Sequence, residues 1–379
     1  MKITKLSLIA TLAMSASFAG GDIAPVEPIV EAPVVETASS TTVDGKLTGY
    51  YITYDGTDSL FGDQSQLAWA ATLNVSHAFN SWATANFSAV GYINTWKLED
   101  TDLGYFEAEK EGGFFNVANL TTTFGDTTFI LGRQLLNTPM LAGFDWLLAP
   151  GSFEAYTVAN SSVENLTLIG SYVRKYRPVN SGEFGNVLDG DNYTLAAAYD
   201  NKTLNGQVWY YDIGAANYTQ VYADLGTTFS GVELAAQYVS TMYDTTGVDD
   251  ASVFGVKAAA TLGGFGLMAA YNNSADNVAS AIGIDSLYTT SWNTFTSGVQ
   301  GDSWKVEAST ELAGISAALS YAYYEYAQAW KVEEGAEIDF ILGYNVNEAI
   351  DLNVVYTNTD YGDGAGDING LEIFANYKF

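Results

Sequence analysis

The sequence predicts an all-β fold, a transmembrane antiparallel β-barrel of about 18 strands with short periplasmic turns and long extracellular loops. Three observations lead to this prediction. Segments that alternate apolar and polar residues recur along most of the chain, and tight turns alternate with long loops between them. The chain also ends in such a segment, Leu371 to Phe379, which closes on an aromatic residue. In a barrel, the apolar face of each segment meets lipid and the polar face lines the lumen.

The alternating segments have the length that a barrel strand needs. In 66–79, the apolar Leu67, Trp69 and Leu73 alternate with small or polar residues. A tilted strand crosses a bilayer in about 9 to 11 residues, and most segments are near that length. A soluble β-sandwich or solenoid shows similar spacing and stays open on this pattern alone. The 18 segments are 45–54, 66–79, 82–95, 114–124, 127–134, 153–160, 166–174, 193–200, 204–212, 217–226, 231–240, 252–262, 265–273, 302–311, 314–326, 336–345, 349–358 and 370–379.

The links between these segments favour the barrel over the sandwich. Tight links such as Gly125-Asp126 and Gly263-Gly264 alternate with long stretches such as 96–113, 175–192 and 274–301. Outer-membrane barrels have this arrangement, with the long loops outside the cell. Only the link between 212 and 217 is short where a long loop is expected. Because hydrocarbon leaves no partner for an open sheet edge, the last strand must pair with the first.

The chain divides into three parts. Residues 1–19 contain Lys2 and Lys5, an apolar run and small residues up to Ala19, which is the pattern of a secretory signal peptide. Residues 20–42 form a Pro-rich linker expected in the periplasm. Residues 43–379 form the predicted outer-membrane β-barrel, with a loop near 135–152 that folds inward.

Charge and composition exclude several functions. The chain has 44 acidic and 14 basic residues, a formal net charge of −30, which argues against nucleic acid as a partner. It has no cysteine and therefore no thiol chemistry. The single histidine, His77, adjoins Ser76, but the two side chains point to opposite faces of a strand. The acidic loop 360–369 lacks the spacing of an EF-hand. We therefore predict no enzyme activity, no catalytic residues, no metal site and no cofactor.

A likeness to a known family appears between residues 127 and 172. The segment Gly132-Arg133-Gln134 is followed by Thr138-Pro139, then Asp145, Pro150 and Phe153. This stretch resembles the OprD-type outer-membrane porin family. The resemblance implies that the loop from Leu135 to Ser152 narrows the channel, with Asp145 as its acidic group and Arg133 at the strand end. The family tends to place an arginine two residues after the acid, where this chain has Leu147.

The basic residues of this region are the other candidate site. All three arginines of the chain are Arg133, Arg174 and Arg177, and Lys175 lies between the last two. We predict a pore constriction formed by Arg133, Asp145, Arg174, Lys175 and Arg177, in which opposite charges face each other across the lumen. The alternative for Arg174, Lys175 and Arg177 is an outer loop that binds lipopolysaccharide phosphate or pairs with nearby acids. The loop 274–301 is a second candidate for inward folding.

The predicted function is that of a porin in the outer membrane of a Gram-negative bacterium. Its expected partners are outer-membrane lipid, lipopolysaccharide and the small hydrophilic solutes or ions that diffuse through it. The net acidity predicts a preference for cations or zwitterions. A surface adhesin or a structural barrel that acts through its long loops is the alternative, and both a monomer and a homotrimer stay open.

Overall fold

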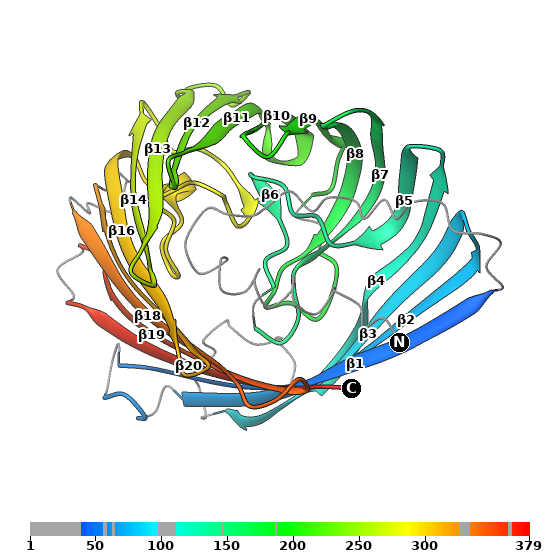
Figure 1. Cartoon of the computed structure of the whole chain (residues 1–379), viewed down its shortest axis with the longest axis horizontal. Helices are drawn as coiled ribbons and strands as arrows, with labels where there is room; N and C mark the ends of the chain where they lie inside the picture. Colours follow the sequence, from blue (N-terminus) through cyan, green and yellow to red (C-terminus); the bar gives the residue numbers. More distant parts are fainter. Residues whose placement is uncertain are drawn as a thin grey trace.

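The wall of the molecule is one closed antiparallel sheet of 18 strands (Figure 1). The computed structural model describes residues 39–55, 59–62, 65–97, 111–145, 147–185, 188–325, 334–362 and 366–379. The predicted fold class, an all-β barrel of about 18 antiparallel strands, is confirmed. The predicted signal peptide, 1–19, lies outside the described residues, as does the linker up to residue 38. The first strand begins at Ser40, within the range predicted as linker.

Each wall strand pairs with its neighbours in the chain. The strands are β1 (Ser40–Tyr54), β2 (Ser65–Asn80), β3 (Ala83–Lys97), β4 (Glu111–Phe124), β5 (Thr127–Gln134), β7 (Ser152–Val163), β8 (Leu166–Arg177), β9 (Asn192–Asp200), β10 (Leu204–Ile213), β11 (Tyr218–Phe229), β12 (Val232–Tyr243), β13 (Ala251–Leu262), β14 (Phe265–Ala275), β16 (Gly301–Leu312), β17 (Ile315–Tyr324), β18 (Gly335–Asn345), β19 (Ile350–Asp360) and β20 (Ile368–Lys378). The short strands β6 (Leu141–Ala142) and β15 (Ile282–Gly283) and the 3₁₀ helices η1 (Gly214–Ala216) and η2 (Thr296–Gly298) lie in the loops.

The ends of the chain close the sheet. β1 pairs with β20 as well as with β2, and Lys46 stands opposite Lys378 in the register. Gly45 and Phe379 exchange both backbone hydrogen bonds, at 2.9 and 3.0 Å. The terminal alternating segment therefore serves as the closing strand. No helix within the described ranges is long and apolar enough to cross a membrane.

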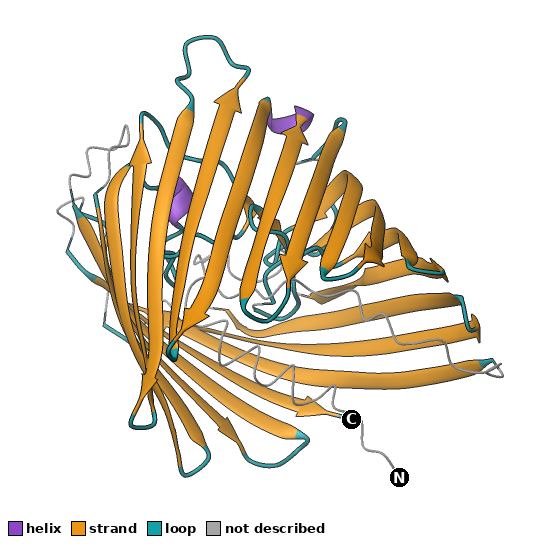
Figure 2. Cartoon of the chain, turned by 45° about the horizontal axis from the view of Figure 1, so that its top comes forward, coloured by secondary structure: helices purple, strands orange, loops and turns teal. Residues whose placement is uncertain are grey.

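The two ends of the barrel differ as predicted. At the end where the termini lie, the strands are joined by turns of two to four residues, such as those between β4 and β5 and between β7 and β8. At the other end the loops are mostly long. Figure 2 shows teal loops beyond the upper ends of the tilted strands at the top of the view. The ambiguous link after β10 is a tight hairpin at this long-loop end. It contains η1 and turns at Asn217, whose φ is 55°.

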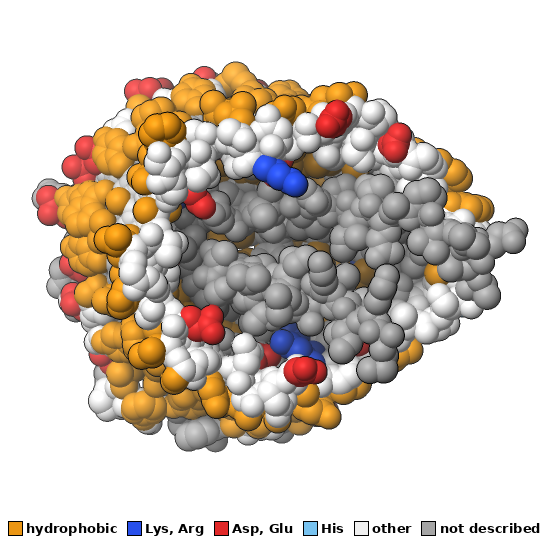
Figure 3. Space-filling view, in the orientation of Figure 1, with side chains coloured by type: hydrophobic (Ala, Val, Ile, Leu, Met, Phe, Trp, Pro, Cys, Tyr) orange, Lys and Arg blue, Asp and Glu red, His pale blue; other side chains and the backbone are white. Residues whose placement is uncertain are grey.

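The outer and inner faces of the wall differ in polarity. On β9, Leu195 faces outward and is 60% exposed, whereas its neighbour Thr194 is buried on the lumen side. On β11, Leu225 faces outward and Asp224 faces the lumen, where it accepts a hydrogen bond from Gln207 (2.7 Å). Hydrophobic side chains gather around the outside of the ring in Figure 3. An apolar outer face around a polar interior is the arrangement of a membrane barrel.

Two loops occupy the lumen. The loop between β5 and β7 contains β6, and the loop between β14 and β16 contains β15. β6 and β15 pair as parallel strands, and Figure 1 shows β6 inside the ring of wall strands. Gly283 in β15 has a φ of 83°, and a side chain there would collide with the carbonyl oxygen of Ala142. Contact between the two loops therefore requires glycine at this position.

The assignment of the outer face predicts the effect of a charge on it. We expect Leu195→Arg to lower the free energy of unfolding by about 2 to 4 kcal/mol, because a lipid-facing arginine near mid-strand must enter hydrocarbon. Urea titration of the protein in lipid vesicles measures this loss. Thr203→Arg, in the tight turn after β9, is the control and should cost only about 0 to 1 kcal/mol. Equal losses in the two variants would contradict the assignment.

Candidate functional site

The loop from 135 to 151 is fixed to the lumen wall by hydrogen bonds to β10. The Tyr211 hydroxyl donates to Thr138 Oγ1 (3.1 Å) and accepts from the backbone N–H of Met140 (3.3 Å). The Thr138 hydroxyl in turn donates to the carbonyl of Leu141 (2.7 Å). Met140 and Tyr211 are buried in a cluster that joins this loop to strands β7 to β13. The Thr138-Pro139 step is thus one of the points at which the loop is fixed to the wall.

The loop from 276 to 300 lies against the first loop. The backbone N–H groups of Ile282 and Ser286 donate to the carbonyls of Met140 (2.9 Å) and Pro139 (2.8 Å). The ring of Trp292 meets that of Phe144 edge to face, with the centroids 6.3 Å apart. The sequence left the course of this loop open. The structure places it across the lumen, where it supports β6.

The second loop also covers an acidic part of the wall. Glu337 on β18 accepts a hydrogen bond from the backbone N–H of Asn293 (2.6 Å). Glu372 on β20 accepts from the indole of Trp292 (2.7 Å) and from the hydroxyl of Tyr50 (2.6 Å). Both carboxyl groups are buried. Because a buried carboxyl group needs donors, these contacts hold the loop on this part of the wall.

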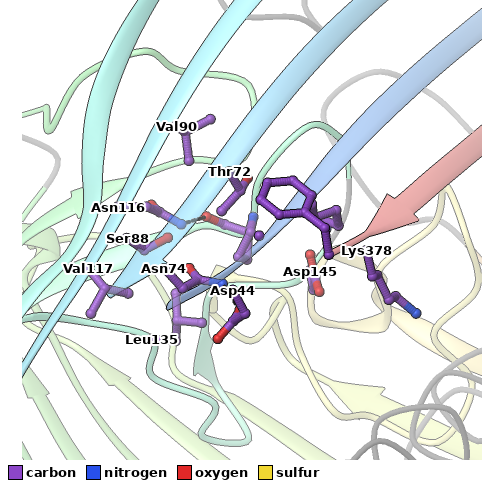
Figure 4. Close-up of a pocket in the computed structure, with 14 residues that line it drawn as sticks. Asp44, Thr72, Asn74, Ser88, Val90, Asn116, Val117, Leu135, Asp145 and Lys378 are labelled. Atoms are coloured by element: carbon purple, nitrogen blue, oxygen red, sulfur yellow. Dashed lines mark hydrogen bonds between the residues drawn. The ribbon is translucent and has the colours of Figure 1, made fainter. Parts of the chain in front are cut away.

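A charged cavity remains beside the first loop. Its volume is about 360 Å³, and its lining includes Asp145 of the loop and Asp44, Lys46 and Lys378 of the wall. Figure 4 shows Asp145 between Asp44 and Lys378. Lys46 and Lys378 are direct cross-strand neighbours on the lumen face of β1 and β20. Lys378 Nζ forms an ion pair with Asp351 Oδ2 (2.8 Å). An exposed loop carboxylate therefore lies near two wall lysines.

Arg133 lies on the opposite face of the wall from the predicted pore position. It pairs with Glu154 in the register. Two residues earlier on β5, Leu131 pairs with Tyr156, and both of these side chains are exposed on the outer face, so Arg133 and Glu154 lie on that face as well. Its Nη1 donates to the carbonyl of Phe115 (3.1 Å), and its guanidinium lies 4.2 Å from the centroid of the Phe184 ring. The alternation of β5 explains this placement, because Arg133 shares the odd-numbered phase of the lipid-facing residues.

Arg174 and Lys175 also lie on the outer face. The register between β7 and β8 shifts at this point: Glu154 pairs with Lys175 and Ala155 with Val173, so Arg174 is an extra residue without a register partner. Glu154 faces outward with its partner Lys175, and the Arg174 side chain is exposed. The residues before and after them, Val173 and Tyr176, are buried on the lumen side. The structure therefore separates these two cations from Asp145, with which they were predicted to form a constriction.

Arg177 is a buried residue that joins the wall to the loops. Its side chain has no exposed surface, and its guanidinium lies 4.2 Å from the centroid of the Phe114 ring. β5 ends at Gln134, so β4 and β7 have no strand between them beyond it. Arg177 spans this gap. It donates to Asn116 Oδ1 (2.9 Å) and to the carbonyls of Pro178 (2.8 Å), Ala149 (3.4 Å), Pro150 and Ser181.

Two cavity residues, Lys46 and Lys378, were missing from the predicted site. A signal for them was present, because closure predicts that the first and last strands pair, and both lysines occupy the polar phase of their strands. The register between strands more than 300 residues apart was still needed to place them together. No group of three or more His, Asp or Glu side chains in the described parts of the chain could hold a metal ion.

The closed sheet, its apolar exterior and the loops inside it define a class, the large β-barrels whose lumen is narrowed by inserted loops. No protein-family model and no curated protein matches the sequence. Solved structures do match over most of the chain.

The matching structures are barrels of the OprD/Occ family of porins. OpdK of Pseudomonas aeruginosa, in a crystal structure with vanillate, has a TM-score of 0.77 at 14% identity, covering 89% of this chain and 98% of its own. OccK9 (OpdG) of the same organism has a TM-score of 0.77 at 17% sequence identity, and the match covers 89% of this chain and 98% of that protein. OccAB4 of Acinetobacter baumannii has a TM-score of 0.77 at 16% sequence identity, and the match covers 92% of this chain and 100% of that protein. The resemblance inferred from residues 127–172 is confirmed at the level of the fold.

The position of Arg177 predicts a loss of stability when it is replaced. We expect Arg177→Met to lower the free energy of unfolding by about 3 kcal/mol or more, because each buried acceptor left unsatisfied costs about 1 to 3 kcal/mol. The midpoint of urea unfolding in vesicles measures this. Arg174→Met, three residues earlier on the same strand but exposed, is the matched control and should change stability little. Similar losses in the two variants would contradict the anchoring role.

Proposed function

We propose that this protein is a porin-type channel in the outer membrane of a Gram-negative bacterium, through which small hydrophilic solutes or ions diffuse. The observation that carries the proposal is a closed barrel with an apolar exterior whose polar lumen is narrowed by two loops held on the wall. A barrel of this strand number is wide enough for an aqueous channel, and inserted loops then determine what passes. The fold of the OprD/Occ porins supports the proposal.

We propose that the narrow part of the channel selects by charge at the cavity beside Asp145. The Asp145 carboxylate on the loop and the ammonium groups of Lys46 and Lys378 on the wall create a field across the solute path. Part of the positive charge is neutralised, because Lys378 is paired with Asp351. With Asp44 also in the lining and a formal net charge of −30, the balance favours cations and zwitterions.

OpdK, one of the matching structures, was crystallised with vanillate, an aromatic carboxylate. In this chain Arg133, Arg174 and Lys175 lie on the outer face, and Arg177 is buried in contacts with the loops. The cavity thus has lysines on the wall and no arginine in its lining as described. We propose that carboxylates without a compensating cationic group pass less readily than zwitterions of the same size.

Planar-bilayer recording tests the channel and its ion preference. We expect stepwise conductance from the purified protein and, in a salt gradient, a reversal potential of the sign that indicates cation preference. A clear anion preference would refute the proposed selectivity. Absence of conductance from folded, heat-modifiable protein would refute the channel and favour a surface role for the long loops.

Asp145 is the residue to change within the cavity. We expect Asp145→Asn to lower the cation-to-anion permeability ratio by roughly two- to five-fold, because a charge about 4 Å from an ion contributes about 1 kcal/mol even in water. Reversal potentials of the variant and the parent protein give this ratio. Asp249→Asn, in the loop between β12 and β13, removes the same charge away from the cavity and should leave the ratio unchanged. An unchanged ratio in both variants would remove Asp145 from the constriction.

A further inference from the structure

We infer that the outer face of β5, β7 and β8 carries a binding site for the phosphate groups of an outer-leaflet glycolipid of the lipid A type. The site consists of Arg133, Arg174 and Lys175, which we call the outer basic patch. The inference rests on the proposed outer-membrane location, since only there does such a lipid surround the protein. It does not depend on the channel's selectivity.

A β-bulge places two consecutive cations on the same face. In a regular strand, neighbouring side chains point to opposite faces, so Arg174 or Lys175 would point into the lumen. Here Lys175 pairs with the outward-facing Glu154, while Val173 pairs with Ala155 and Tyr176 with Phe153 on the lumen side. Arg174 is the inserted residue between Val173 and Lys175, and its side chain is exposed. Bulges of this kind change the direction of a side chain. The bulge thus presents a pair of positive charges to the outside.

Arg133 completes the outer basic patch across the neighbouring strands. Arg133, Glu154 and Lys175 form one row, because Glu154 is the register partner of both basic residues. Three cations around one carboxylate leave a local excess of positive charge. The Arg133 side chain is also held in place, by its hydrogen bond to the carbonyl of Phe115 (3.1 Å) and by a cation–π contact with the ring of Phe184. Guanidinium groups fixed in this way suit the tetrahedral oxygens of a phosphate.

Aromatic residues mark the level of the membrane interface directly beneath the patch. Tyr156, Tyr172 and Tyr193 on β7, β8 and β9 stack in sequence, with ring centroids 6.3 and 5.2 Å apart. Tyrosine rings on the outer face of a barrel gather at the level of the lipid headgroups. The Tyr172 hydroxyl donates to Asp191 Oδ1 (2.9 Å). The outer basic patch therefore lies at the level where lipid phosphates are expected, two residues along β7 from the row of tyrosines and toward the long loops.

The patch lies at the outer end of the barrel. β5 and β8 each begin after a tight turn, and the basic residues are near their far ends, next to the long loops. Long loops face the outside of the cell. The other basic side chains with described surroundings lie elsewhere: Lys46, Lys257, Lys305 and Lys378 on the lumen face, Arg177 buried, and Lys202 in a tight turn at the opposite end. In an acidic protein, this local positive charge is complementary to phosphate.

The binding experiment uses the full-length protein in detergent with hexa-acylated lipid A as the probe. Affinity is measured for diphosphoryl, monophosphoryl and dephosphorylated lipid A by microscale thermophoresis. We expect affinity to fall with each phosphate removed. We also expect the double variant Arg174→Gln/Lys175→Gln to bind the diphosphoryl form about ten-fold or more weakly. Arg133→Gln should weaken binding independently, and Arg174→Lys should retain most of it.

Controls distinguish a loss of lipid A affinity at the outer basic patch from a general effect on charge, folding or the channel. Lys202→Gln removes an exposed cation from the opposite end and should bind like the parent protein. Heat-modifiable migration shows that each variant is folded, and unchanged bilayer conductance shows that the channel is unaffected. Equal affinity of the parent and the double variant, or equal affinity for phosphorylated and dephosphorylated lipid A, would overturn the inference. Full competition by inorganic phosphate at the lipid's own concentration would also overturn it. Loss of conductance with lipid binding retained would refute only the channel.

Discussion

Complete pairing of the backbone around the ring is the constraint on which the rest of the structure depends. In hydrocarbon an unpaired N–H or C=O costs several kcal/mol, so a sheet in that environment must have no open edge. Here the sheet is sealed where the two ends of the chain meet, down to the hydrogen bonds between Gly45 and Phe379. The same seam brings Lys46 and Lys378 together on the lumen face. Closure therefore creates part of the charged cavity.

The shortness of β5 determines the shape of the lumen. β5 has 8 residues, whereas β4 has 14 and β7 has 12. After Gln134 the chain leaves the wall and enters the lumen, and the edges of β4 and β7 beyond this point have no strand between them. Arg177 supplies donors there to Asn116 and to several carbonyls. One buried side chain thus compensates for the interruption of the wall and holds the loop that narrows the channel.

Charge is used differently on the two faces of the wall. On the lumen face, buried carboxyl groups such as those of Glu337 and Glu372 accept hydrogen bonds from the loop 276–300 and so determine its position. On the outer face, the few basic residues are concentrated above a row of stacked tyrosines. The outer face thus carries a local cluster of positive charge near the lipid headgroups, whereas the lumen face carries both buried carboxyl groups and the lysines of the cavity. A net charge of −30 conceals this pattern, because it sums over both faces.

The sequence by itself determined the fold class, the strand number, the alternation of tight turns and long loops, and the closing strand. These follow from period-two polarity and turn residues, which act over a few neighbouring positions. The phase of Arg133 was readable in the same way, from Phe129 and Leu131 before it. Only the tertiary structure decided the bulge at Arg174, the burial of Arg177, the pairing of Lys46 with Lys378, and the course of the loop 276–300. Each of these depends on contacts between segments far apart in the sequence, and a pattern over a few neighbouring residues does not determine the free energies of such contacts.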